Sequence, residues 1–218
     1  MEALRNHNRV IHEVRCSSEQ IKNAVQQIRP DLRVNIVDQH QLLKITRGLH
    51  QGIALCCEPI KIHKKLDKSL LTSNILVLDH LQDVTNIGSI MRSMVAMNFR
   101  ILITSQRGVP NLEQAAIKTA CGALEYLTIF QVANIRQCIA DLKRTGFWCV
   151  GLDHEGIHSV NSINEDRLAI IIGSEGDGIQ GLVKKECDQL VRLSTAPDFP
   201  VLNASVAAAV AMYIMGSP

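Results

Sequence analysis

The sequence has few aromatic residues and no long apolar run. Aromatic side chains make up 3% of the 218 residues, so few flat surfaces exist on which nucleic-acid bases could stack. No apolar stretch approaches the roughly 20 residues that a membrane-spanning helix needs, and residues 1–18 are too polar for a secretory signal. We therefore expect a cytoplasmic protein with no membrane segment.

Paired cysteine motifs are also lacking. None of the seven cysteines belongs to a Cys-x-x-Cys pair, and most lie in apolar stretches, as Cys149 does after Phe147 and Trp148. This usage is typical of reduced core thiols in a cytosolic protein. The sequence therefore predicts neither a disulfide framework nor a zinc site, and we expect no metal.

The net charge of +2 is unevenly spread. Residues 1–73 hold 12 Lys/Arg and 7 Asp/Glu, a net of +5, which leaves 11 and 14 of the totals of 23 and 21 for residues 74–218, a net of −3. The basic first third favours a polyanionic partner. A solvated lysine-rich linker explains the excess equally well; its lysines are Lys61, Lys64, Lys65 and Lys68.

The lysine-rich stretch suggests a domain boundary, with a first domain at 1–62, a basic linker at 63–73 and a second domain at 74–218. In the first domain we expect strands at 10–14, 34–37 and 52–57. Ser17 with Gln20, and Asp38 with Gln41, form two capping-box patterns. They predict helices that end at residue 28 and span 39–46, so the first domain is a small α/β module.

In the second domain, short apolar runs alternate with amphipathic segments. The predicted strands are 75–78, 101–104, 126–130, 148–151, 168–172 and 190–193. The predicted helices are 87–97, 112–119, 135–145, 182–186 and 204–215. Wholly apolar strands such as 168–172 are typical of a parallel sheet that helices cover on both faces, which is an α/β fold.

Unusual residues follow three of these strands, where ligands bind in open α/β sheets. After the first, Asp83 or Thr85 could cap a helix, and Gly88 permits close backbone approach. Asn86 and Arg92 are six residues apart, so they share no helical face unless Asn86 precedes the helix. A capped helix with a surface arginine is the plainer interpretation.

The strand at 168–172 leads into a loop with the sequence Gly173-Ser174-Glu175-Gly176-Asp177-Gly178. Its glycine order, G-x-x-G-x-G, differs from the G-x-G-x-x-G of dinucleotide sites, and its two carboxylates would repel a pyrophosphate. A cationic ligand would be better tolerated, and a turn without a ligand remains an alternative.

The last helix, 204–215, follows Leu202 and Asn203. Asn203 or Ser205 could cap it. Because the helix has no charged residue, we expect it to be buried on nearly all sides, either in a subunit interface or in tight internal packing.

Together these segments resemble the three motifs of the SpoU/TrmH-type RNA 2′-O-ribose methyltransferases of the SPOUT superfamily, over residues 74–215. The motif residues here are Asp83, Asn86, Gly88 and Arg92; Gly173, Glu175, Gly176 and Gly178; and Leu202, Asn203 and Ser205. The end of the first module, from His50 to Ile53, resembles the L30e-like RNA-binding domain of the large-subunit rRNA methyltransferase branch.

The resemblance implies a trefoil-knotted sheet, a homodimer through the knotted domain, and S-adenosylmethionine as methyl donor, with S-adenosylhomocysteine as product and no metal. It implies that the catalytic residues are Asn86, Arg92, Glu175 and Asn203. It implies that the cofactor-binding residues are Gly173, Ser174, Glu175, Gly176, Gly178, Leu193, Leu202 and Ser205. Arginine is too basic to act as a proton acceptor, so we expect Arg92 to stabilise the developing alkoxide.

Two positions depart from the family pattern, with Val84 in place of proline and Val201 in place of serine. The resemblance favours 23S-type rRNA as the substrate, because family members acting on tRNA often lack the L30e-like module. A tRNA substrate is the nearest alternative. The valine at 201 favours another, a catalytically weak RNA-binding or ribosome-assembly protein. A nucleotide-binding oxidoreductase is disfavoured by the glycine order.

Overall fold

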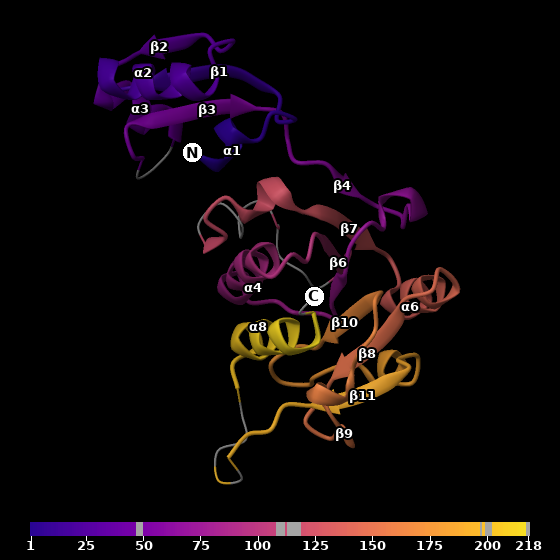
Figure 1. The fold of residues 1–218 in the computed structure, drawn as a ribbon. Helices are drawn as coiled ribbons and strands as arrows, with labels where there is room; N and C mark the ends of the chain where they lie inside the picture. The colour runs from indigo at the N-terminus through magenta and orange to yellow at the C-terminus, as the bar shows by residue number, and fades with distance from the viewer. Residues whose placement is uncertain (47–49, 108–111, 113–118, 197, 199–201, 217–218) are drawn as a thin grey trace. The chain divides into compact units, whose positions relative to one another are not determined.

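The computed structural model describes residues 1–46, 50–107, 112, 119–196, 198 and 202–216. The chain divides into two compact units, at 1–60 and 61–218, which Figure 1 draws in one view. The predicted helix at 112–119 falls almost wholly outside the described residues, as does Val201. Among the residues that are described, no helix is long and apolar enough to cross a membrane.

The first unit is a small α/β module, as predicted. Its sheet has the order β2-β1-β3, with β1 (Ile11–Cys16) parallel to β2 (Val34–Ile36) and antiparallel to β3 (Ile53–Cys57). The helices are α1 (Glu2–Arg5), α2 (Glu19–Ile28) and α3 (Gln39–Thr46). Val14 and Val25 are fully buried in its core.

The second unit is built on a sheet in which every described strand pair is parallel. Its order is β4-β7-β6-β5-β10-β8-β11-β9. The strands are β4 (Ile62–His63), β5 (Ile75–Leu78), β6 (Ile101–Ser105), β7 (Thr128–Val132), β8 (Trp148–Leu152), β9 (His158–Ser159), β10 (Leu168–Ile172) and β11 (Gln189–Arg192). Because all strands run the same way, their carboxyl ends share one edge.

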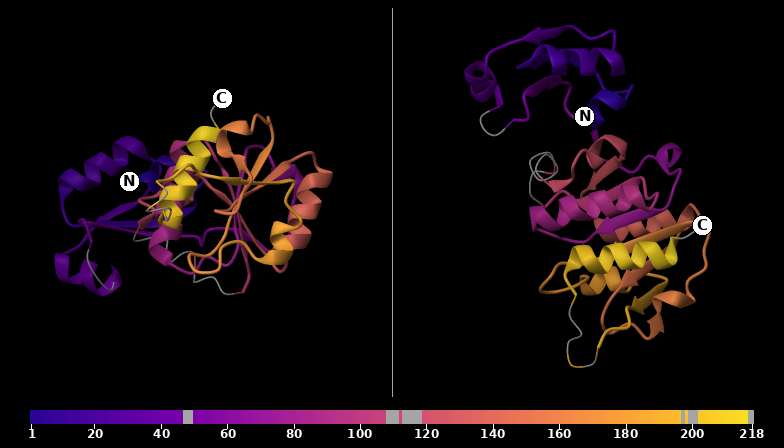
Figure 2. Two further views of the ribbon diagram at one scale, coloured as in Figure 1. Left: turned by 90° about the horizontal axis from the view of Figure 1, so that it is seen from below. Right: turned by 60° about the vertical axis from the view of Figure 1, so that its left-hand side comes forward.

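Helices cover both faces of this sheet, as Figures 1 and 2 show. The helices α4 (Val84–Ala96) and α8 (Ala204–Met215) pack side by side on one face, and α6 (Ile135–Arg144) packs with α7 (Gly181–Lys184) on the other. Short 3₁₀ turns are η1 (Lys68–Leu70), η2 (Ala123–Tyr126) and η3 (Val160–Ser162). The predicted α/β class and two-sided parallel sheet are confirmed.

The seven cysteines are all free, with Cys138 on α6 and Cys149 on β8 buried and Cys56 and Cys121 exposed. Burial raises the pKa of the Cys138 thiol to about 12. Such a thiol stays protonated at neutral pH and is a poor nucleophile or metal ligand.

One connection crosses the sheet in an unusual way. β8 and β9 are consecutive in sequence, yet β11 lies between them and pairs with both. The connection between β8 and β9 therefore passes over β11. Gly156 in this connection lies so close that a Cβ there would be 2.5 Å from the carbonyl carbon of Val191, which only glycine avoids.

Local predictions failed where the cap or the packing differed from the pattern. Ser18, not Ser17, caps α2 by accepting a hydrogen bond from Ile21 N at 3.3 Å, while Ser17 N donates to Gly52 O. The strand predicted at 126–130 begins at Thr128, because η2 occupies the residues before it. At Asp38 the prediction is confirmed, since its carboxylate accepts from Gln41 N at 2.8 Å.

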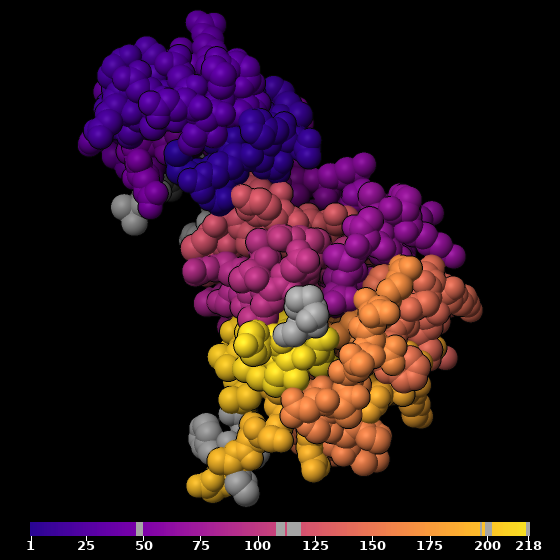
Figure 3. Space-filling view, in the orientation of Figure 1, coloured from indigo at the N-terminus to yellow at the C-terminus, as the bar shows by residue number. Residues whose placement is uncertain are grey.

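The prediction that the last helix is buried on nearly all sides is wrong for the single chain. One face of α8 packs inward through Ala208, Ala211 and Met212, which are fully buried. The opposite face leaves Val206 48%, Val210 37% and Tyr213 68% exposed. Figure 3 shows α8, in yellow, at the molecular surface. The absence of charge on this helix therefore marks an uncovered apolar face.

Candidate active site at the carboxyl edge of the sheet

Two of the predicted catalytic side chains, Asn86 and Glu175, meet at the centre of the carboxyl edge. Asn86 lies in the first turn of α4 after β5, and Glu175 lies in the loop after the neighbouring strand β10. Asn86 Nδ2 donates hydrogen bonds to Glu175 Oε1 and, at 3.0 Å, to Asp83 Oδ2. The bond to Glu175 joins two motifs that are 89 residues apart.

This meeting point is also where the strand order reverses. From β5 the chain continues outward through β6 and β7, whereas β10, β8 and β11 lie on the other side of β5. In open parallel sheets a crevice opens beyond the carboxyl ends of the strands at such a reversal, and ligands bind there. The Asn86–Glu175 pair therefore lies where the fold favours a binding site.

Arg92 lies one and two-thirds turns beyond Asn86 on α4. Because α4 begins at Val84, both residues are helical and their side chains point about 120° apart. Asn86 is 5% exposed, whereas Arg92 is on the surface. Among the described residues, the Arg92 guanidinium has no hydrogen bond or ion pair, so its charge is available to a ligand.

The glycine-rich loop at 173–178 closes on itself. Ser174 N donates to Gly178 O at 3.0 Å, and Gly178 N donates to Ser174 O at 3.1 Å. A Cβ at Gly173 would lie 2.0 Å from the carbonyl carbon of Gly178, and Gly178 has φ +65°. Both glycines are therefore required by the backbone. A Cβ at Gly176 would meet no described atom within 4 Å.

Asp79, to which the sequence interpretation gave no role, holds this loop in place. Its side chain is fully buried at the end of β5. Asp79 Oδ2 accepts a hydrogen bond from Gln180 N at 2.8 Å, just beyond the loop, and Oδ1 lies 2.7 Å from His80 Nδ1. Asp79 N donates to Ile172 O. The available signal was a carboxylate directly after a wholly apolar strand.

A cavity of about 410 Å³ lies beside α8. It is lined by Val160 and Asn161 of η3, Leu193, Ser194, Thr195 and Ala196 after β11, Leu202, and Val210 and Ile214 of α8. The predicted cofactor contacts Leu193 and Leu202 thus line the same cavity. The volume falls within the range of small-molecule sites, about 300–1,000 Å³.

Asn203 and Ser205 form the N-cap of α8. Asn203 Oδ1 accepts hydrogen bonds from Ser205 N at 2.9 Å and from Ser205 Oγ at 2.6 Å. No hydrogen bond between described residues links this pair to Asn86 or Glu175. The predicted site residues therefore form two groups, one at the Asn86–Glu175 contact and one around the cavity and the start of α8. No hydrogen bond between described residues joins Arg92 to either group.

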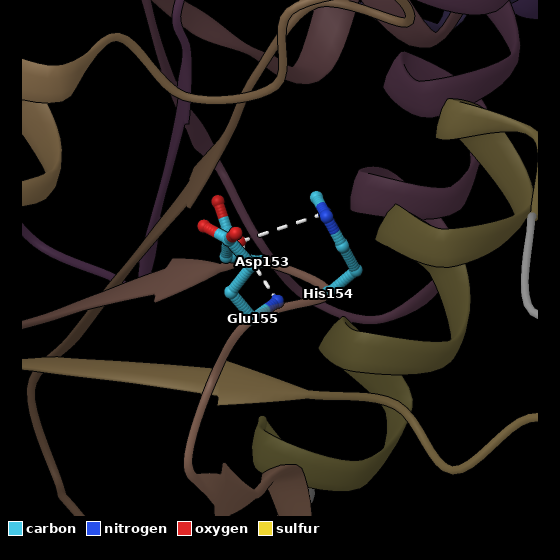
Figure 4. Close-up of side chains that lie close together, drawn as sticks. All are labelled: Asp153, His154 and Glu155. Carbon is cyan, nitrogen blue, oxygen red and sulfur yellow. Dashed lines mark hydrogen bonds and ion pairs between the residues drawn. The ribbon is translucent and has the colours of Figure 1, made fainter.

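A second buried carboxylate, Asp153, follows β8 (Figure 4). Its Oδ2 lies 2.7 Å from Lys184 Nζ, and its Oδ1 accepts from Glu155 N at 2.9 Å. Burial alone would raise the pKa of Asp153, but the hydrogen bonds from Lys184 and Glu155 lower it overall. The same contact raises the pKa of Lys184. His154 and Glu155 lie beside Asp153, and Lys184 supplies the cation of this group.

Two family models match the sequence. One is described as the SpoU rRNA Methylase family and covers residues 73–213. The other is described as RNA 2′-O ribose methyltransferase substrate binding and covers residues 1–63.

Named relatives agree with these matches. One relative is a Synechocystis protein named as an uncharacterized tRNA/rRNA methyltransferase. It is 33% identical over 83% of this chain, and this chain spans about half (49%) of its length. A putative TrmH family tRNA/rRNA methyltransferase of Staphylococcus aureus is 33% identical over 90% of this chain and 81% of its own length. The crystal structure of the SpoU methyltransferase AviRb from Streptomyces viridochromogenes, in complex with AdoMet, covers 98% of this chain and 85% of its own, with TM-score 0.78 and 20% identity. That likeness shows the fold.

Proposed function

The chain belongs to the SpoU family of tRNA/rRNA methyltransferases, and from this premise we propose that it methylates a ribose 2′-hydroxyl of structured RNA. The methyl donor in this proposal is S-adenosylmethionine. The observation that carries the proposal is the contact between Asn86 and Glu175 at the reversal of the strand order. Arg92, exposed on the same helix, adds a positive charge.

The residues present fit such a donor. The loop at 173–178 closes tightly because Gly173 has no side chain, and beside Gly176 no described atom lies within 4 Å of a Cβ position. The cavity lined by Leu193 and Leu202 has the size and the apolar walls that an adenosine group needs. Glu175 and Asp177 add negative charge near the loop, which suits a sulfonium cation and disfavours a pyrophosphate.

When bound, S-adenosylmethionine supplies a methyl group that the positive sulfur already activates, so no metal is needed. As the ribose oxygen attacks, an O–C bond forms, the C–S bond breaks with its electron pair going to sulfur, and the hydroxyl proton leaves to solvent. We propose that Arg92 stabilises the developing negative charge on that oxygen. Asn86 and Glu175 orient the reacting groups, and Asn203 fixes the start of α8 beside the cavity.

Ribosomal RNA is the substrate that we favour over tRNA. The support is the match of residues 1–63, which include the first unit, to a substrate-binding model of RNA 2′-O ribose methyltransferases. In this proposal residues 1–62 select the RNA and residues 74–218 carry the chemistry. The relatives are named for tRNA and rRNA together. The preference for rRNA therefore rests on the substrate-binding match of the N-terminal residues.

We also propose a homodimer through α8 and a trefoil knot in the second unit. The apolar face with Val206, Val210 and Tyr213 supports the homodimer, because such a surface gains stability when a second copy covers it. The knot is supported by the connection that passes over β11. In light scattering, Tyr213→Glu should convert a dimer to a monomer; a wild-type monomer would refute the dimer.

The test of the activity is transfer of tritiated methyl groups from S-adenosylmethionine to purified 23S-type rRNA and to bulk tRNA. We expect incorporation into rRNA by the wild type, and none by Arg92→Ala although that variant still binds the donor in calorimetry. Methyl transfer by Arg92→Ala would contradict the proposal that Arg92 stabilises the developing charge on the ribose oxygen. Binding of RNA without any transfer would favour the assembly-protein alternative that Val201 suggests.

A further inference from the structure

The lysine-rich stretch between the two units is part of a folded sheet. β4 pairs with β7 through Ile62↔Ile129 and His63↔Phe130. Gln106 Nε2 donates to Gln131 O at 2.9 Å and to Lys64 O at 3.4 Å. These contacts fix the backbone, so the stretch differs from the freely solvated linker that the sequence left open as an explanation.

The lysines of this stretch carry their positive charge at the surface. Lys61, Lys64, Lys65 and Lys68 are all exposed, and none makes an ion pair within the part of the chain that the structure describes. Lys64 Nζ instead lies 2.5 Å from the neutral Gln131 Oε1. We call these four residues, together with exposed Arg107 after β6, the lysine edge.

The single acid within this stretch, Asp67, is engaged elsewhere. Its Oδ1 accepts hydrogen bonds from Ser69 Oγ at 2.7 Å and from Ser69 N at 3.0 Å. These bonds are the main reason that the pKa of Asp67 is lowered. Asp67 therefore stays ionised as the cap of η1, and it forms no ion pair with the neighbouring lysines.

Lys64 and Arg107 of the lysine edge lie at the same edge of the sheet as the candidate active site. Lys64 follows β4 and Arg107 follows β6, so both are at the carboxyl ends of parallel strands, as Asp79 and Asn86 are after β5. Three strand spacings separate β4 from β5, which is roughly 14 Å at about 4.8 Å per strand. Residues 63–68 line an open hollow, and Figure 1 shows β4 beside β7.

We propose that the lysine edge binds backbone phosphates of the RNA on one side of the target nucleotide. This inference rests on the proposed function, because it makes RNA the polyanion. Lysine is a compact charge on a long stem, which suits phosphate contacts that carry no sequence information. The low aromatic content of 3% also favours backbone contacts over base stacking. The lysine edge thereby holds the RNA so that the target nucleotide lies at Asn86 and Arg92.

The test uses the full chain and the double variant Lys64→Ala/Lys65→Ala, with Lys185→Ala as matched control. Lys185 is likewise exposed, and it ends α7, which leads away from the carboxyl edge. The probe is a mixed-sequence single-stranded RNA of about 20 nucleotides, titrated at several salt concentrations. The slope of log K against log salt is negative. Losing two phosphate contacts should make it shallower by about 1.4 and weaken binding roughly tenfold at 0.15 M salt.

Donor affinity is measured in parallel by calorimetry with S-adenosylmethionine, and it should stay unchanged in all variants. If the double variant binds RNA with the affinity and salt dependence of the wild type, RNA binding by the lysine edge is refuted while the proposed function stands. If the wild type transfers no methyl group but binds RNA more tightly than the double variant does, the proposed function fails. RNA binding by the lysine edge then stands. Wild-type protein without salt-dependent RNA binding would refute both.

Discussion

Asn86 donates a hydrogen bond from its side-chain amide to the Glu175 carboxylate, and this contact fastens the start of α4 to the loop after β10. Asn86 also binds Asp83, the N-cap of the same helix. The amide is thus held by two carboxylates and is 5% exposed. Its donor hydrogens fix Glu175 in one orientation at the reversal of the strand order.

Replacing Asn86 with Asp should abolish methyl transfer and weaken donor binding. The substitution exchanges two donated hydrogen bonds for repulsion between a buried carboxylate and the exposed carboxylates of Asp83 and Glu175. Leaving the one buried group unsatisfied costs about 1–3 kcal/mol. Calorimetry with S-adenosylmethionine and tritium transfer check this. Ser89→Ala, one turn further along α4, serves as control, and equal activity of Asn86→Asp and wild type would contradict the assignment.

Gly173→Ala should disrupt the loop at 173–178. Its Cβ would collide with backbone atoms of Gly178 at 2.0 Å and of Ile179 at 2.2 Å, which cannot rotate away. We expect donor affinity to fall at least tenfold. Gly181→Ala is the matched control, because a Cβ there meets no described atom within 4 Å. Similar donor affinities in the two variants would show that the loop geometry is unimportant.

Asp79→Ala should raise the KM for the donor, because Gln180 N loses its acceptor and the loop its anchor. Asp79→Asn keeps one oxygen that can accept from Gln180 N, so we expect it to recover most of the loss. Steady-state kinetics with both variants separate KM from kcat. Equal defects in the two variants, with unchanged KM, would indicate that Asp79 only supports the core.

Lys184→Met should destabilise the protein at neutral pH by about 3 kcal/mol, because Asp153 would be left buried without its partner. The folded pKa of Asp153 is lowered. Its contribution is therefore present above the unfolded value of about 3.9 and is lost as pH falls through the lower folded pKa.

Urea unfolding at pH 7 and in acid checks this, with Lys185→Met as the exposed control. The free energies of unfolding of wild type and Lys184→Met should differ at pH 7 and converge in acid. No difference at pH 7 would show that the ion pair adds nothing to stability.

Strands and helices marked by a continuous local pattern could be predicted from the sequence. The wholly apolar runs Ile75–Leu78 and Leu168–Ile172 became β5 and β10 with the predicted bounds, because burial on both faces requires every side chain to be apolar. The helix Ala204–Met215 also matches its prediction.

Features that depend on distant partners could not be predicted. β4 has only two residues, and its partner Ile129 lies 67 positions from Ile62, so no local periodicity marks it. The role of Asp79 depends on Gln180, which is 101 residues away. The exposed face of α8 was missed because a helix without charges has the same pattern whether its own chain or a second copy covers it.

The motifs identified the candidate site residues, but their geometry required the structure. The sequence predicted a helix at 87–97, which would place Asn86 before it, but α4 begins at Val84 and includes Asn86. The contact of Asn86 with Glu175 joins segments whose proximity depends on the pairing of β5 with β10.

The measurement that tests the central claim most directly is alkaline hydrolysis of rRNA labelled by the protein with tritiated S-adenosylmethionine. Alkali cleaves RNA through the free 2′-hydroxyl, so methylation of that oxygen protects the adjoining phosphodiester bond. We predict that the label is recovered in alkali-resistant dinucleotides from one position, and that Arg92→Ala yields none. Label in mononucleotides, which places the methyl group on a base, or the absence of label from RNA would contradict the account.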